Sequence, residues 1–117
     1  MTRAFVRVAM ALVLAFALIT IMNTQAQAQG SAKALFLKNQ CNRCHSLSAQ
    51  HIKRLGSISS MLHKPPDLSH VGKIRNATWI VGWLEHKNLL HGKKHLKIWK
   101  GTPAETQQLA NWLASMK

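Results

Sequence analysis

The chain has 117 residues, of which 16 are Lys or Arg and only 3 are Asp or Glu, giving a formal charge of +13 with neutral histidines. This length suits one small domain, and the absence of neighbouring carboxylates or a nucleophile triad argues against an enzyme. The basic residues are spread from Lys33 to Lys117 in place of one dense run, so the charge does not favour a nucleic-acid-binding protein.

The first thirty residues have the three parts of a secretory leader. Arg3 and Arg7 give a positive start, an apolar run follows over residues 8–22, and an Ala-x-Ala pair ends at Ala28. We expect residues 1–28 to be a signal peptide that is cleaved after export to the periplasm. An uncleaved membrane anchor is the alternative, although a spanning helix needs about 20 apolar residues and this run is shorter.

Cleavage would leave a single domain over residues 29–117, with fourteen basic and three acidic residues and a formal charge of +11. A domain of this size buries a modest core and often depends on a disulfide, a metal or a cofactor. The charge predicts electrostatic steering toward an acidic protein or an anionic membrane face. Because an exported protein rarely meets nucleic acid, we expect no nucleic-acid partner.

Residues 31–40 predict a short helix, because their apolar positions recur at helical spacing. These positions are Ala32, Leu35 and Phe36, followed by Asn39. The helix leads directly into the two cysteines of the chain, so it is placed to support the chemistry of that segment.

The pentapeptide Cys-Asn-Arg-Cys-His at residues 41–45 carries the most specific chemical signal. A disulfide or a thioredoxin-like exchange site is one interpretation, but no strand-like alternation accompanies the pair. A Cys2His2 zinc site is a second, with His86/His91 or His91/His95 as its other half. The third is covalent haem, because C-x-x-C-H is the c-type attachment pattern.

Haem attachment explains the position of the histidine, which the other two interpretations do not. Cys41 and Cys44 would form thioethers with the porphyrin, and His45 would be the proximal ligand of the iron. Together with the leader and the basic, helix-rich chain, the motif predicts one covalent haem c.

The remainder of the chain predicts a long connection and two more helices. Residues 46–72 show little periodicity, as expected for a segment that wraps around a cofactor. Residues 76–90 restart the helical period, with Asn76 as a cap and one broad face made of Trp79, Ile80, Trp83 and Leu84.

The last helix is the best marked in the sequence. Thr102 is the predicted N-cap, Pro103 occupies the first helical position, and Glu105 completes a capping box. A core stripe follows, formed by Leu109, Trp112, Leu113 and Met116.

With these motifs, the chain resembles a small monohaem class I cytochrome c. The resemblance covers nearly all of residues 29–117 and lies in four segments: ALFLKNQCNRCHSLS, PPDLSHVGK, ATWIVGWLEH and KGTPAETQQLANWLASMK. It implies an all-α fold in which three to four helices wrap around one covalently attached haem and the N- and C-terminal helices cross.

The chain departs from this family where the second axial ligand of the iron is expected. The family supplies a methionine shortly before the last helix, but the segment LLHGKKHLKIWKGT contains none. His95 takes approximately that position, with Trp99 and Gly101 following as the aromatic residue and glycine of the pattern do. Since a neutral imidazole is a good iron ligand, we expect bis-histidine coordination by His45 and His95.

Other ligands remain open at this stage. His91 is the next candidate and His86 the third, and Met61 or an open sixth position are further alternatives. Two imidazoles imply a lower potential than a His/Met pair, because a thioether ligand raises the potential.

The resemblance implies an exported carrier of single electrons, without a small-molecule substrate, that docks acidic redox proteins through an exposed haem edge. We expect four lysines to flank that edge: Lys93, Lys94, Lys97 and Lys100. The alternatives are a haem subunit of a membrane-bound respiratory or dehydrogenase complex, held by an uncleaved leader, and a ligand-binding haem protein with an open sixth position.

Overall fold

The structure, a computed structural model, describes Met10, residues 27–56 and residues 64–117. The chain divides into two compact units, Met1–Ser31 and Ala32–Lys117. Most of the leader predicted over residues 1–28 lies outside the described residues. No helix in the described part of the chain combines the length and the hydropathy that crossing a bilayer requires.

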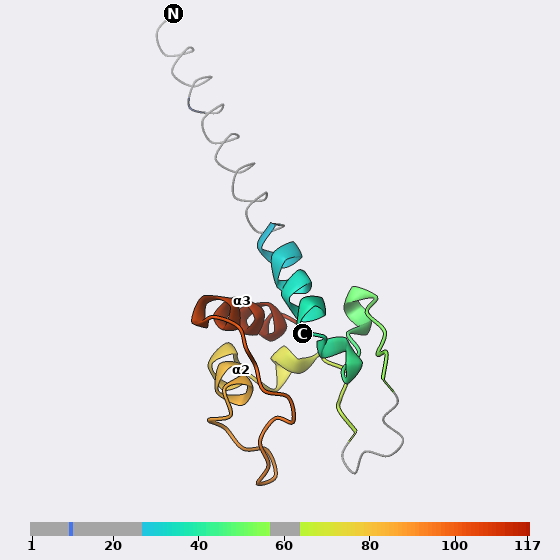
Figure 1. The fold of residues 1–117 in the computed structure, drawn as a ribbon. Helices are drawn as coiled ribbons and strands as arrows, with labels where there is room; N and C mark the ends of the chain where they lie inside the picture. The colour runs from blue at the N-terminus through green and yellow to red at the C-terminus, as the bar shows by residue number, and fades with distance from the viewer. Residues whose placement is uncertain (1–9, 11–26, 57–63) are drawn as a thin grey trace, which may run out of the picture. The chain divides into compact units, whose positions relative to one another are not determined.

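The second unit is built from three helices joined by short 3-10 turns and irregular segments, which confirms the expected all-α class. Residues 27–38 are helical, and residues 32–38 form the first helix of this unit; α2 spans Ala77–Leu84, and α3 spans Pro103–Ala114. Among the described residues between the first helix and α2 lie three turns of 3-10 helix: η1 at Cys41–Arg43, η2 at Ser48–Gln50 and η3 at Val71–Lys73. Residues 32–56 and 64–117 contain no strand, only two isolated bridges. Figure 1 shows α2 lying beside α3.

The start of α3 forms as the sequence predicts. The Thr102 side chain accepts a hydrogen bond from the backbone N–H of Glu105 at 3.2 Å, and the Glu105 carboxylate accepts one from the N–H of Thr102 at 2.8 Å. Both donors would otherwise be unsatisfied at the helix terminus. The predicted stripe is buried as well, since Leu109, Trp112, Leu113 and Met116 are each at most 7% exposed.

The first helix and α3 are in contact through two large aromatic side chains. Phe36 and Trp112 are both buried, and their rings meet edge to face with centroids 6.0 Å apart. Such a pair contributes about 0.5–1.5 kcal/mol beyond the area it buries. This contact joins the helix before the cysteines to the helix at the end of the chain.

Helix α2 begins at its predicted cap but ends earlier than the sequence period indicates. The Asn76 side chain accepts a hydrogen bond from the N–H of Trp79 at 2.8 Å. The helix stops at Leu84, where residues up to 90 were predicted to continue it, because His86 adopts a left-handed φ of 61°. The Asn88 amide then folds back and donates to the carbonyl of Trp79 at 2.9 Å.

Candidate functional site

The cysteines and His45 lie in one tight turn. Gln40 has a left-handed φ of 55°, which ends the first helix and starts η1. The backbone N–H groups of Cys44 and His45 both donate to the carbonyl of Cys41, at 3.1 and 2.9 Å. Neither cysteine is in a disulfide, so both sulfurs keep their thiol chemistry while the turn fixes their spacing to His45.

The Cys41 thiol is poorly suited to disulfide exchange. Its burial raises its pKa to about 11, although the nearby Lys97 ammonium acts in the opposite direction. Because the thiolate is the nucleophile in exchange, a protonated thiol reacts slowly. The absence of strands from the described part of the chain also leaves a thioredoxin-like site without its βαβ scaffold.

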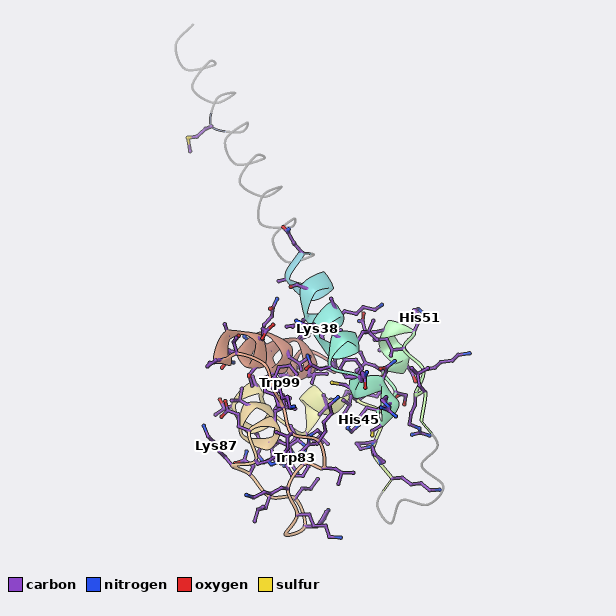
Figure 2. The ribbon with its side chains drawn as sticks, viewed as in Figure 1. Lys38, His45, His51, Trp83, Lys87 and Trp99 are labelled. Carbon is purple, nitrogen blue, oxygen red and sulfur yellow. The ribbon has the colours of Figure 1, made fainter. Side chains whose placement is uncertain are left out.

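The structure brings His45 and His95 together although they are fifty residues apart. Their imidazole rings are nearly parallel, with an interplanar angle of 13° and centroids 6.2 Å apart. His45 comes two residues after the end of η1 (Figure 2). His95 comes from the segment between α2 and α3. Two histidines from distant segments therefore share one site.

Both rings are held in the tautomer that ligates a metal through Nε2. The Nδ1 atom of His45 lies 2.9 Å from the carbonyl oxygen of Pro66, and that of His95 lies 2.9 Å from the carbonyl oxygen of Lys97. A carbonyl only accepts, so each Nδ1 carries the proton and each Nε2 carries a lone pair. Neither Nε2 hydrogen-bonds to another described residue. A metal-bound histidine commonly donates its other ring N–H to a backbone carbonyl in this way.

Both imidazoles also favour the neutral form. Burial lowers the pKa of His45 below its ordinary value, although the Pro66 carbonyl acts in the opposite direction. Burial likewise lowers the pKa of His95; the Lys97 carbonyl acts in the opposite direction, and the Lys97 ammonium lowers the pKa further. Neutral imidazole is the form that binds a metal ion.

The separation of the two rings suits a shared metal ion. With metal–nitrogen bonds of about 2.0 Å on opposite sides, the two ring centroids would be roughly 6 Å apart. Two aromatic rings in direct contact also lie at this distance. The distance alone therefore does not distinguish a shared metal ion from a direct ring contact. The shared tautomer and the neutral state of both rings favour ligation, and His95 as the second ligand stays a prediction that this geometry supports.

The other candidate ligands are placed differently. His91 lies exposed in a tight turn between Leu90 and Lys93, with a φ of 51°. The Nε2 atom of His86 lies 3.3 Å from the carbonyl oxygen of Lys97. Met61 lies outside the described residues. The described residues contain no group of three or more His, Cys, Asp or Glu side chains arranged to hold a metal ion, as a Cys2His2 zinc site would need.

A carboxylate that the sequence analysis did not single out, Asp67, braces the segment whose Pro66 carbonyl binds His45. Asp67 accepts hydrogen bonds from the hydroxyl and N–H of Ser48, at 2.6 and 3.2 Å, and from the N–H of Ser69 at 2.8 Å. These bonds tie Asp67 to η2, nineteen residues earlier, and fix the backbone next to Pro66. The signal in the sequence was the recurrence of serine on both sides of the connection, at Ser46, Ser48 and Ser69.

We expect Asp67→Asn to destabilise the protein at pH 7 by roughly 1 kcal/mol, because a solvated, charge-assisted network is lost. Burial alone would raise the pKa of Asp67, but the serine hydrogen bonds outweigh it and hold the pKa well below the ordinary value. The stabilisation is therefore complete above the unfolded pKa of about 3.9 and is lost as the pH falls toward the folded pKa. Thermal unfolding at pH 7 and pH 3 measures this.

The matched control for Asp67 is Glu85→Gln, which removes a surface ion pair with Lys87 at 2.6 Å. We expect that change to have little effect at either pH. If Asp67→Asn costs the same stability at pH 3 as at pH 7, the ionised carboxylate is not what braces the segment.

Comparisons of this chain with protein-family models, with curated proteins and with solved structures gave no match. The geometry of the site and the residues of the motif are therefore the basis for a functional proposal.

Proposed function

We propose that this protein is an exported carrier of single electrons that binds one haem c covalently through Cys41 and Cys44. The proposal places the iron between His45 and His95 and takes the contact between the first helix and α3 as the helix crossing of a class I cytochrome c. The observation that carries it is the approach of two neutral, parallel imidazoles beside a pair of free cysteines in a C-x-x-C-H turn.

The residues present fit a covalent haem. Thioether formation adds a thiol S–H across a vinyl C=C bond, so sulfur bonds to one carbon and the hydrogen moves to the other without an external oxidant. Cys41 and Cys44 are both free, and the η1 turn holds them three residues apart. Each histidine offers an Nε2 lone pair, with its Nδ1 fixed by a backbone carbonyl.

The bound haem would supply reversible one-electron chemistry. The role of the chain is to hold the iron from two sides with His45 and His95 and to restrict access to it. Two nitrogen ligands give a lower potential than nitrogen with a thioether. Because His45 and His95 would both hold the iron, we expect no site there for a small-molecule substrate, and we propose no enzymatic activity.

The purified protein should carry the mass of one haem in addition to its polypeptide, and mass spectrometry under denaturing conditions will test this. Its ferric electron paramagnetic resonance spectrum should be that of low-spin iron with two imidazoles. A five-coordinate spectrum and prompt binding of carbon monoxide to the reduced protein would favour an open sixth position. A preparation without haem would refute the proposal. The same mass spectrum reports whether residues 1–28 are removed.

We propose that the partners are acidic redox proteins, because the segment that carries His95 is basic and exposed. Lys93, Lys94, Lys97 and Lys100 are all exposed there. Electron exchange with an acidic partner should therefore slow as ionic strength rises, since salt screens exposed charges. A rate that does not change with salt would mean that the charge serves solubility alone.

A further inference from the structure

The ring of Trp83 lies edge-on against His95. Their centroids are 5.6 Å apart and their planes meet at 62°. The Trp83 side chain comes from α2 (Figure 2). His95 comes from the irregular segment that follows α2. Trp83 thus joins the second imidazole of the site to a helix.

Trp83 is itself held in place on its other side. It stacks on Trp79 one turn earlier in α2, with centroids 5.5 Å apart and an interplanar angle of 18°. The guanidinium of Arg75 lies 4.2 Å from the centre of the Trp79 ring, which is within the range of a cation–π contact. Arg75, Trp79, Trp83 and His95 therefore form one continuous chain of ring contacts that begins just before α2.

The segment around His95 offers little else to fix the orientation of its ring. Leu96 and Ile98 are 83% and 64% exposed. The Nδ1 bond of His95 goes to a carbonyl only two residues away, so it moves with the segment. The Lys97 ammonium donates to the carbonyl of Asn39, which anchors the segment at Lys97 and does not contact the imidazole.

We propose that Trp83 is a positioning residue that holds the His95 imidazole nearly parallel to that of His45. This inference rests on the proposed haem ligation. The angle between two axial imidazole planes determines how the iron d orbitals split, so it sets the anisotropy of the low-spin ferric spectrum. A side chain that fixes this angle changes the spectrum without ligating the metal.

The test is the ferric electron paramagnetic resonance spectrum of the haem-loaded variant Trp83→Leu. We expect its anisotropy to shift and its lines to broaden as His95 rotates, while the covalent haem is retained. Carbon monoxide should bind the reduced variant between about twofold and tenfold faster than wild type, because an aromatic contact that holds the ligand is lost. Trp83→Phe keeps an aromatic edge and should stay close to wild type in both measurements.

The outcomes separate the inference from the proposed function. If Trp83→Leu retains haem and has the wild-type spectrum, Trp83 does not position His95, and the haem proposal stands. If the wild-type protein itself carries no haem, the proposed function fails. Should Trp83→Leu not fold, Trp79→Leu decides: removing the stack behind Trp83 should shift the spectrum in the same direction, and an unchanged spectrum would overturn the inference.

Discussion

The double variant Cys41→Ser/Cys44→Ser should accumulate as a polypeptide without any covalently bound haem. Both thioethers require a thiol, and the described residues contain no other cysteine. If the haem stabilises the fold as a ligand at a thousandfold excess over its dissociation constant would, its loss lowers the free energy of unfolding by about 4 kcal/mol. For a domain of this size that lowers the melting temperature by about 15 °C or more. Mass spectrometry and thermal unfolding measure the two effects.

The single variants are the matched controls for the double variant. Cys41→Ser and Cys44→Ser should each keep one thioether, so each retains the mass of the haem with an intermediate loss of stability. Abundant double variant that still carries covalent haem would refute the attachment site. Equal stability of wild type and double variant would mean that the fold does not depend on the cofactor.

Features with a local cause could be predicted from the sequence. The capping box of α3 needs only Thr102 and Glu105 three residues apart, and the turn after Cys41 follows from the spacing of the motif. The predicted end of α2 at residue 90 was wrong, because the hydrophobic periodicity of the sequence continues past Leu84, where the helix ends. What stops the helix is the left-handed conformation of His86, which periodicity does not report.

The choice between His91 and His95 illustrates the limit of reasoning from spacing. Both histidines follow α2 in the sequence at separations that would allow either one to bind the iron. In the structure, His91 and Gly92 have φ values of 51° and 73° and form the turn between Leu90 and Lys93. Positive φ at both central residues is the signature of a type I′ hairpin, and its usual pairs, Asn-Gly, Asp-Gly and Gly-Gly, place glycine second, as here. The His-Gly dipeptide was thus a readable signal that His91 belongs to a turn.

Local patterns alone do not predict contacts between distant segments. The approach of His95 to His45, fifty residues apart, was expected only through the resemblance to a haem protein family. The bond from Ser48 to Asp67, nineteen residues apart, was not expected. The edge-on contact of Trp83 with His95 depends on how the segment after α2 returns to the site. The sequence identified Trp83 as part of an apolar face, but that face alone does not reveal its partner.

Replacing His95 should change the iron site more than any other single substitution outside the attachment turn. His95→Ala should convert the ferric spectrum from low-spin to that of an iron lacking a strong sixth ligand. Carbon monoxide should then bind the reduced protein promptly. His95→Met should restore a low-spin spectrum and raise the midpoint potential by a substantial part of the roughly 0.8 V that axial ligands control. Redox titration measures this shift.

His91→Ala is the matched control for His95, because it removes a nearby imidazole from an exposed turn. It should leave the spectrum, the carbon monoxide reaction and the potential at wild-type values. If His95→Ala keeps the low-spin spectrum and His91→Ala loses it, the second ligand is His91. The segment between α2 and α3 would then have to rearrange when haem binds, because in the present structure it is His95, and not His91, that faces His45 across 6.2 Å.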